Sequence, residues 1–531
     1  MKKILMVSLL FTLLFILSIF NGCTNNDSDY RIMTEKELKD KIAGGWAGKM
    51  IGVVYGDPTE FRARSVIYEK DLIWNPDLIK GALGQDDLYV QMSFMMTMDE
   101  YGMDAPAEKF AESFANAGYR LWHANRKARK NYWDGIMPPL SGSPEYSMHA
   151  DDIDFQIEAD YIGFMCPGMP QTSNQMCDKI GHIMNYGDGV YGGMFVCALY
   201  TTAYFENNIR KIIESALLAI PEESQYAQCI RDVITGYENN PEDWRKTWQE
   251  IQDKWGSDDI CGAMDPFNID AKINGAYIIM GLLYGEGDMQ KTMEVSIRCG
   301  QDSDCNPSNA AGVLGILKGY SNIEDKWKSS IPSMADSQFI FTNYSFNLVV
   351  KNTLDYAKKI IVENGGRIEG DNLYIKTQYP VAPALEQSFT DIKVAYRTSH
   401  EDETWTWKGK WEEFKYTNSG GEFSGKISQA NDSECTISFN GSGFLLMGHW
   451  DQDGGKADIY LDGTKVQTID TYYWVGGAGA GAGWLNGAHL YHVLGLEPGD
   501  HSLRIVATGE KNEKATGSKL YIERAIVYQP K

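Results

Sequence analysis

Two carboxylates, Asp302 and Asp304, stand two residues apart in a polar turn that directly precedes a run of small and apolar residues. This run is expected to be a helix, because Asn306 can cap it, Pro307 suits its first turn, and apolar positions recur at three- and four-residue spacing. Hard cations such as Mg²⁺ prefer oxygen ligands, and carboxylates offset by two residues can converge on one ion. The alternative is a turn whose acids only cap a helix.

A second acidic pair, Asp86 and Asp87, lies far upstream. It follows a glycine-containing turn and precedes another apolar run at helical spacing. Both acidic pairs are therefore expected at helix starts, where side chains are held rigidly.

A glycine-rich segment, KIAGGWAGKMIGVVYGDPTEF, precedes the second pair. It carries Gly44, Gly48, Gly52 and Gly56 at a four-residue period and then Glu60. Each glycine costs a helix about 1 kcal/mol relative to alanine. The period therefore predicts a smooth helix face that packs closely against another element.

Together these segments resemble the ADP-ribosylglycohydrolase family. The N-terminal segment of that family reads roughly GxxxGxxxGDxxGxxxE, and the four glycines and Glu60 align with it without a gap. The two acidic pairs align with its two metal motifs. The resemblance spans roughly residues 34–320, and residues in register with the middle segments of the bacterial branch are Asp154, Gln156, Asp160, Pro167, Gly168, Tyr191 and Gly192.

The resemblance implies a mainly α-helical domain with the fold of this family and a Mg²⁺ site of one or two ions. Its ligands would be Asp86, Asp87, Asp302 and Asp304. Mn²⁺ or Ca²⁺ are alternatives, since both also accept oxygen ligands.

Several positions depart from the family pattern. Val53 replaces an Asp, Gln85 and Leu88 replace the threonines of the first metal motif, and Cys305 replaces the threonine of the second. A thiol is a poor partner for a hard ion, so one metal site is safer to assume than two. Gln85 and Asn306 are further candidates for contact with metal or substrate.

Cleavage of a glycosidic bond usually needs two carboxylates, one to donate a proton and one to activate water or attack. With the four acids above assigned to metal, Glu60, Asp154 and Asp160 are the catalytic candidates. By analogy with the family, Glu60 would be either the acid/base group or a gate over the metal. Asp154 and Asp160 have an equally good alternative as structural caps or ion-pair partners.

The N-terminus has the features of an export signal. Two lysines precede an apolar run within residues 1–22, which we interpret as a signal peptide, and Cys23 follows as a candidate lipidation site. Residues 23–33 would then be a lipoprotein tether. An uncleaved membrane anchor is the alternative. Either interpretation predicts an exported protein in the periplasm or on the outer cell surface, held at the membrane only by its anchor.

Composition fits an acidic extracytoplasmic protein. The chain has 531 residues with 72 acidic and 49 basic side chains, a formal charge of −23, which disfavours nucleic acid as a partner. The 9 cysteines show no paired framework and are expected to be mostly buried small residues. His123, His149 and His182 are the only histidines of the N-terminal domain, and the HExxH spacing is missing, so zinc chemistry is disfavoured.

A change of pattern near residue 366 predicts two domains. Helical periodicity dominates residues 34–365, a linker would cover 366–385, and short alternating segments in 386–531 predict strands of an all-β jelly-roll sandwich. The second domain resembles galactose-binding-like modules of glycan-degrading enzymes. Its tryptophans, among them Trp450, Trp474 and Trp484, could stack on sugars, although core packing explains aromatic residues in a sandwich equally well.

Three functions compete. The favoured one is an exported, metal-dependent glycoside hydrolase of the ADP-ribosylglycohydrolase type that acts on a carbohydrate or glycoside. The second is a true ADP-ribosyl hydrolase. The third is a non-catalytic glycan-binding lipoprotein, which the departures at Val53, Gln85 and Cys305 keep open.

Overall fold

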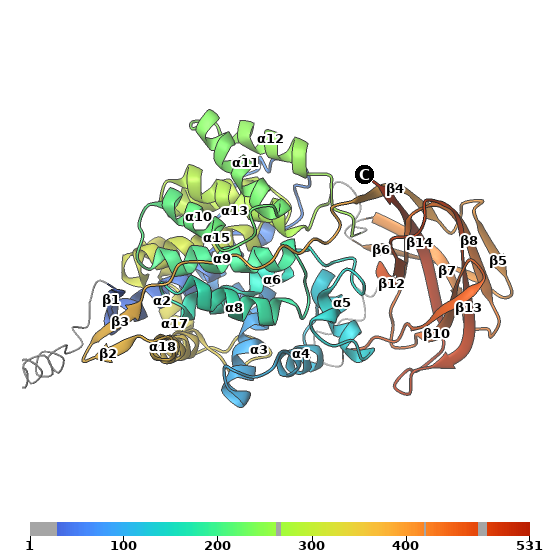
Figure 1. Cartoon of the computed structure of the whole chain (residues 1–531), viewed down its shortest axis with the longest axis horizontal. Coiled ribbons are helices and arrows are strands. Elements are labelled where there is room, and N and C mark those ends of the chain that lie inside the picture. Colours follow the sequence, from blue (N-terminus) through green and yellow to red (C-terminus); the bar gives the residue numbers. More distant parts are fainter. Residues whose placement is uncertain (1–28, 262–266, 419–420, 476–485) are drawn as a thin grey trace, which may run out of the picture.

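The chain forms a helical domain followed by a domain of antiparallel strands (Figure 1). The computed structural model describes residues 29–261, 267–418, 421–475 and 486–531. The signal peptide, Cys23 and Trp484 therefore lie outside the described residues. No helix within the described ranges is long and apolar enough to cross a membrane.

The helical domain has one large apolar core, to which nearly all of its helices contribute. The predicted mainly α-helical fold of this domain is confirmed. The helices are α2 (Glu35–Gly56), α3 (Asp86–Tyr101), α4 (Ala107–Asn116), α5 (His123–Trp133), α6 (Asp154–Glu158), α7 (Asp160–Met165), α8 (Pro170–Gly181), α9 (Asp188–Ala203), α10 (Ile209–Leu217), α11 (Gln225–Asn239), α12 (Trp244–Trp255), α13 (Ala271–Gly285), α14 (Met289–Arg298), α15 (Cys305–Lys318), α16 (Asp325–Lys328), α17 (Ile331–Met334) and α18 (Phe346–Glu363).

Helices α2 and α15 pack with their main chains in contact, as the glycine period predicts. A Cβ atom added at any of the four glycines would lie 2.0–2.3 Å from a main-chain oxygen of α15 or of the turn before it, closer than atoms can approach. Only glycine allows this packing. The partners run in opposite directions: Gly44 faces Gly315, Gly48 faces Ala311, Gly52 faces Pro307, and Gly56 faces Ser303.

A small sheet corrects the predicted tether and linker. Strand β1 (Tyr30–Thr34) pairs antiparallel with β3 (Asn372–Lys376), which also pairs with β2 (Arg367–Glu369). Residues 30–33, predicted as tether, and residues 367–376, predicted as linker, are thus parts of one sheet on the helical domain. The sequence pattern did not reveal this pairing, because its partners lie far apart in the chain.

The C-terminal strands form two antiparallel sheets around a shared apolar core. The 5-stranded sheet has the order β11-β10-β13-β8-β5, and the 6-stranded sheet has the order β12-β9-β14-β7-β6 with β4 paired to β14. The strands are β4 (Ile392–Ser399), β5 (Trp405–Lys408), β6 (Glu412–Asn418), β7 (Gly421–Ser428), β8 (Glu434–Gly441), β9 (Gly443–Gly448), β10 (Gly455–Leu461), β11 (Thr464–Asp470), β12 (Ala488–Val493), β13 (Gly499–Lys511) and β14 (Leu520–Pro530).

The two domains share an apolar interface. Met148 and Ala150 of the helical domain pack with Leu445, Met447 and Ile526 of the sandwich. Polar contacts add to this surface, since Tyr528 Oη donates to the carbonyl of Ile260 at 2.6 Å and His492 Nε2 lies 3.0 Å from the carbonyl of Pro144. The sandwich is therefore fixed against the region around α5, as Figure 1 shows.

The cysteines are buried, as predicted. All those in the described residues are free thiols inside the protein: Cys166, Cys177, Cys197, Cys229, Cys261, Cys299, Cys305 and Cys435.

Candidate metal and active site

The acids at the two predicted helix starts meet at one cavity of about 520 Å³. Helix α3 begins at Asp86 and α15 begins at Cys305, so both acidic pairs occupy helix N-termini. The cavity is lined by the sequence-predicted residues Glu60, Gln85, Asp86, Asp154, Asp302 and Asp304, together with Cys305. Asp87, Asp160 and Asn306 do not belong to this lining.

Main-chain and hydroxyl contacts hold the turn after α2 against the turn before α15. Thr59 Oγ1 lies 2.7 Å from Ser303 Oγ and also donates to the carbonyl of Gly56 at 2.7 Å. The amide of Phe61 donates to the carbonyl of Gln301 at 3.0 Å. Thr59 and Phe61 are the chain neighbours of Glu60, and Gln301 and Ser303 are those of Asp302. The contacts between these neighbours therefore bring the carboxylates of Glu60 and Asp302 to the same wall of the cavity.

The start of α15 differs in detail from the prediction. Asp304, not Asn306, occupies the N-cap position, and its side chain makes no capping hydrogen bond. Asn306 lies in the first turn, where its amide donates to Asn274 Oδ1 at 2.9 Å. The Asp304 carboxylate is therefore not used for capping.

Asp302 and Asp304 are buried but incompletely paired. They are 4% and 3% exposed, and within the described part of the chain the Oδ1 atom of each lacks a hydrogen-bond partner. Burial, and next the Asp304 carboxylate, raises the pKa of Asp302 well above its usual range. Burial also raises the pKa of Asp304 to about 6, and burial with the adjacent Asp87 raises that of Asp86 to about 7. A buried carboxylate without a partner is costly unless it is protonated or meets a cation.

Glu60 lies at the rim of this acidic cluster. Its side chain reaches solvent on one side. The surrounding protein, and then the carboxylates of Asp304 and Asp86, raise the pKa of Glu60 to about 9. Without a cation nearby, Glu60 thus holds a proton at neutral pH.

The match to a family model decides the assignment. Residues 34–344, more than half of the chain, match the model of the ADP-ribosylglycohydrolase family. The chain belongs to the ADP-ribosylglycohydrolase family. This membership indicates a hydrolase and agrees with the predicted helical fold.

Solved structures show more distant similarity to parts of the chain. A structure titled ADP-ribosylglycohydrolase-related protein complex is 11% identical, covers 61% of this chain and 98% of its own, and has a TM-score of 0.42. The CBM36-1 domain of a multidomain xylanase from the hindgut metagenome of Trinervitermes trinervoides is 15% identical, covers 25% of this chain and 94% of its own, and has a TM-score of 0.16. No curated protein matches significantly.

The residues present suit the divalent cation that ADP-ribosylglycohydrolases typically use. One oxygen each from Asp302 and Asp304 and the sulfur of Cys305 lie within 4.8 Å of one another. The unpartnered Oδ1 atoms of the two aspartates are the hard donors that Mg²⁺ prefers. The carboxylates of this cluster could therefore hold a metal, and Cys305 contributes the least suitable donor.

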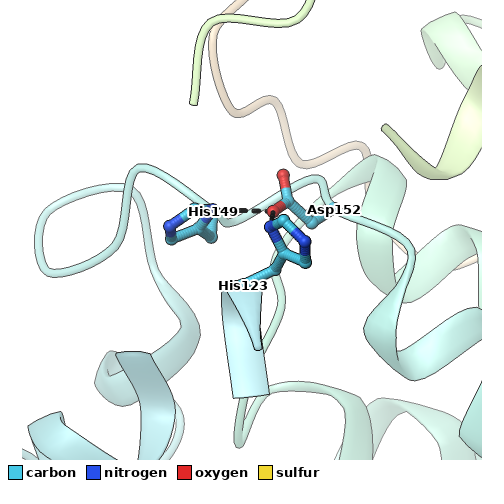
Figure 2. A group of neighbouring side chains, drawn as sticks. All are labelled: His123, His149 and Asp152. Atoms are coloured by element: carbon cyan, nitrogen blue, oxygen red, sulfur yellow. Dashed lines mark hydrogen bonds and ion pairs between the residues drawn. The ribbon is translucent and has the colours of Figure 1, made fainter. Parts of the chain in front are cut away.

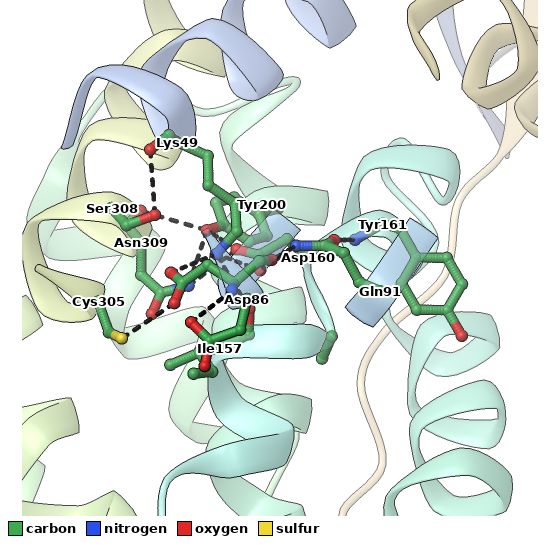
Figure 3. A network of polar contacts seen from close by, with 12 residues as sticks. Lys49, Asp86, Gln91, Ile157, Asp160, Tyr161, Tyr200, Cys305, Ser308 and Asn309 are labelled. Atoms are coloured by element: carbon green, nitrogen blue, oxygen red, sulfur yellow. Dashed lines mark hydrogen bonds and ion pairs between the residues drawn. The ribbon is translucent and has the colours of Figure 1, made fainter. Parts of the chain in front are cut away.

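Lys49 neutralises two other predicted site residues (Figure 3). Its ammonium lies 2.8 Å from Asp160 Oδ2 and 3.2 Å from Asp87 Oδ2, and all three side chains are fully buried. Burial opposes the charge on Lys49, but Asp160 and Asp87 outweigh this effect and raise its pKa. Asp160 also accepts hydrogen bonds from Tyr200 and from Asn309. The structure thus places Asp160 in a closed ion-pair network behind the cavity.

Two further predicted residues have partners of their own. Asp154 accepts hydrogen bonds from the amides of Ala124 at 3.2 Å and Asn125 at 3.0 Å, so it caps the start of α5. Burial raises the pKa of Asp154 to about 7 despite these donors. Gln85 donates to Asp57 Oδ1 at 2.8 Å.

The replacement at Cys305 changes what surrounds Asp87. The thiol of Cys305 donates to Asp87 Oδ1 at 3.0 Å, while Asp87 Oδ2 faces Lys49. Both oxygens of Asp87 are therefore occupied by protein groups. Of the four predicted ligands, Asp86, Asp302 and Asp304 remain available to a metal.

Sequence reasoning missed much of the cavity wall. Aromatic rings form one side, with Phe61 and Phe267 at a centroid distance of 4.8 Å and Phe267 stacked on His123 at 5.6 Å. Arg64 and Arg126 also line the cavity. Asn486 reaches it from the sandwich domain, so this domain takes part in the wall. Of the residues that sequence reasoning missed, only Lys49, which lies behind the cavity, left a signal in the sequence. It is a lone charge within the apolar segment of a glycine-rich helix.

The tryptophans proposed for sugar stacking have different surroundings. Trp450 is 3% exposed, and its ring packs on Tyr473 with Arg126 at 5.5 Å from its centroid. Its ring faces are therefore engaged at the domain interface and leave no free platform for a sugar. Trp474 is half-buried.

Proposed function

We propose that the protein is an exported, metal-dependent glycoside hydrolase that cleaves a glycosidic bond of a glycan, furanoside or ADP-ribosyl-like substrate. The observation that carries this proposal is the cavity in which Asp86, Asp302 and Asp304 converge with Glu60, two of them with oxygens that lack partners. Family membership supports hydrolysis, and the carboxylates supply the groups that glycosidic cleavage requires.

The proposed metal ligands are Asp86, Asp302 and Asp304, with one ion favoured over two. When bound there, Mg²⁺ orients vicinal sugar hydroxyls and neutralises the carboxylates around it. Asp87 supports this site indirectly, since Lys49 and Cys305 already occupy its oxygens.

Glu60 is the proposed general acid. Burial is the largest cause of its raised pKa and still acts when a metal neutralises Asp86 and Asp304, which favours a proton on Glu60 for transfer to the oxygen or nitrogen that leaves the anomeric carbon. After the proton has left, the same carboxylate can accept a proton from water. Asp154 is the second carboxylate of the cavity wall, although it already caps α5 through two main-chain donors. The catalytic role predicted for Asp160 receives no support from its position, because Lys49 and other donors enclose it.

A true ADP-ribosyl hydrolase is the second candidate. Arg64 and Arg126 line the same cavity, and a guanidinium group such as that of Arg64 suits phosphate. The aromatic group of Phe61, Phe267 and His123 offers ring faces on which a base could stack. These features favour a substrate that contains phosphate and a planar group.

A substrate panel separates these functions. Glycans, aryl furanosides and nucleosides would be assayed beside ADP-ribosyl-arginine and ADP-ribosyl-serine, each with Mg²⁺ and with a chelator. We expect Mg²⁺-dependent release of a sugar from at least one glycoside. Turnover of the ADP-ribosyl substrates alone would establish the second candidate. Binding without any turnover would favour a glycan-binding protein with a degraded site.

Export and membrane attachment through lipidated Cys23 are part of the proposal and rest on the sequence of residues 1–33. The formal charge of −23 supports a protein without a nucleic-acid partner. Metabolic labelling with a fatty acid tests the anchor. Wild-type protein should carry the label in the membrane fraction, and the Cys23→Ala variant should not.

A further inference from the structure

Three side chains with metal-binding atoms meet beside the cavity, outside the acidic cluster described above (Figure 2). They are His123 at the start of α5 and His149 and Asp152 in the loop before α6. Asp152 Oδ2 lies 2.7 Å from His149 Nδ1 and 3.8 Å from His123 Nδ1, and all three atoms lie within 4.8 Å of one another.

We propose that His123, His149 and Asp152 form a second metal site, selective for a zinc-class transition metal ion. Two imidazoles and one carboxylate are the donor set that such ions accept, whereas Mg²⁺ prefers oxygen alone. Donor atoms bound to one tetrahedral ion lie about 3.2–3.5 Å apart, given metal–ligand distances of about 2.0–2.1 Å. The observed separations straddle this range, so small side-chain rotations suffice.

An unpartnered oxygen points to a missing ligand. Asp152 is fully buried, and its Oδ1 atom has no hydrogen-bond partner among the residues that the structure describes. Neighbouring buried acids are satisfied by the protein: Asp259 accepts from the amides of Cys261 and Ile269, and Asp270 pairs with Lys272. Among the described residues, the Asp152 carboxylate has close contacts only with His149 and, at 3.8 Å, with His123. A cation between the three side chains would compensate its charge.

Ring contacts hold both imidazoles in place. His489 of the sandwich stacks on His149 with centroids 4.0 Å apart and planes 3° from parallel. Phe267 stacks on His123. Rigid ligands favour metal binding, because little freedom is lost when the ion arrives.

Two features distinguish this group of side chains from one that only forms a structural hydrogen bond: an ion can reach it from the cavity, and a coordination position remains open. The His123 side chain is 26% exposed and lines the cavity, so an ion can enter from there. Three protein ligands leave a fourth position for water or a substrate group, the arrangement of catalytic zinc sites. Arg126 also lines the cavity and carries a positive charge, but its guanidinium lies 5.5 Å from the ring centroid of Trp450 and donates to the carbonyl of Asn486.

Cobalt binding to the full-length protein tests the proposal. Apo protein would be titrated with Co²⁺ in millimolar Mg²⁺, which occupies the oxygen-rich site. We expect one equivalent of Co²⁺ with strong visible d–d absorption, displaced by Zn²⁺. His123→Ala and Asp152→Asn should each weaken Co²⁺ binding by at least about tenfold, since each removes one of three ligands.

Two controls keep the test independent of folding and of the Mg²⁺ site. His501→Ala removes a surface histidine that pairs with Asp462 and should leave Co²⁺ binding unchanged. Circular dichroism and melting curves should show that the tested variants fold. Folded wild-type protein without visible Co²⁺ bands, or bands that persist in both His123→Ala and Asp152→Asn, would overturn the second site while leaving the proposed hydrolase intact.

Discussion

Two groups of buried carboxylates lie next to each other and are neutralised in different ways. Asp87 and Asp160 share the ammonium of Lys49, a cation that the chain itself supplies. Asp302 and Asp304 each keep an oxygen that no described residue contacts through a hydrogen bond. The residue type is the same in both groups, so the partner decides the role: the first group belongs to the folded scaffold, and the second is free to recruit a cation.

Removal of the internal cation should have the largest effect on stability. Lys49→Met leaves Asp87 and Asp160 buried without compensation, and we expect the free energy of unfolding to fall by about 3–5 kcal/mol. Urea denaturation measures this change. Lys39→Met, at an exposed position of the same helix, is the matched control and should stay within about 0.5 kcal/mol of wild type. A loss of unfolding free energy as small as that of the control would contradict the view that Lys49 neutralises Asp87 and Asp160.

Neutralising one acid in each group should change the metal-free melting temperature in different ways. Without metal, Asp160→Asn should lower the melting temperature, because Lys49 loses a partner. Asp304→Asn should keep or raise it, because an uncompensated charge disappears. With Mg²⁺ at a hundred times its dissociation constant, wild type should gain about 2.7 kcal/mol and Asp304→Asn almost nothing. Melting curves with and without Mg²⁺ measure these changes. If Mg²⁺ raised the melting temperature equally in wild type and in Asp304→Asn, the proposed metal site would be refuted.

Glu60 should matter for turnover and not for folding. Glu60→Gln preserves shape but removes the titrating group, so turnover of the substrate found in the panel should fall at least about a hundredfold. The melting temperature should remain that of wild type, since Glu60 lies at the rim. Steady-state kinetics and a melting curve measure both. Retained turnover would transfer the role to another carboxylate, and Asp154 would be tested next.

The acidic cluster should also make the protein sensitive to pH. Folding raises the pKa of Asp304 to about 6 and that of Asp86 to about 7. The folded state therefore binds more protons than the unfolded state between about pH 4 and pH 7, and metal-free stability should fall as pH rises through this window. Mg²⁺ competes with these protons, so its affinity should rise there by up to about tenfold per pH unit for each proton that it displaces. Calorimetric titrations from pH 5 to 8 test this expectation, and a flat affinity would contradict it.

Local patterns predicted the parts of the site that depend on a single segment. The glycine period predicted the packing face of α2, and the apolar runs after Asp87 and Asp304 predicted α3 and α15. Each of these features follows from helix geometry and residue size within one stretch of chain. The family resemblance then supplied the expectation that the two acidic starts meet.

The remaining features depend on contacts between distant segments. Lys49 stands beside Asp160 only because α2 packs against α7, and His123 approaches His149 only after the loop between them folds back. The pairing of Tyr30–Thr34 with Asn372–Lys376 joins opposite ends of the helical domain. No period or motif reports such contacts, which explains why the ion-pair network, the histidine group and the first strand were missed.

The packing of α2 against α15 also has a consequence for how the protein folds. Gly56 and Ser303 are nearly half the chain apart, and their contact requires closure of a very long loop. Contacts of this kind form late, after local helices and hairpins have appeared. A nascent chain that ends before residue 302 contains Glu60 and Asp86 but has no site, because both the second acidic pair and the surface that faces the glycines are still missing. Metal binding at the proposed site would thus report completed folding, and a partly folded chain should be unable to capture the ion prematurely.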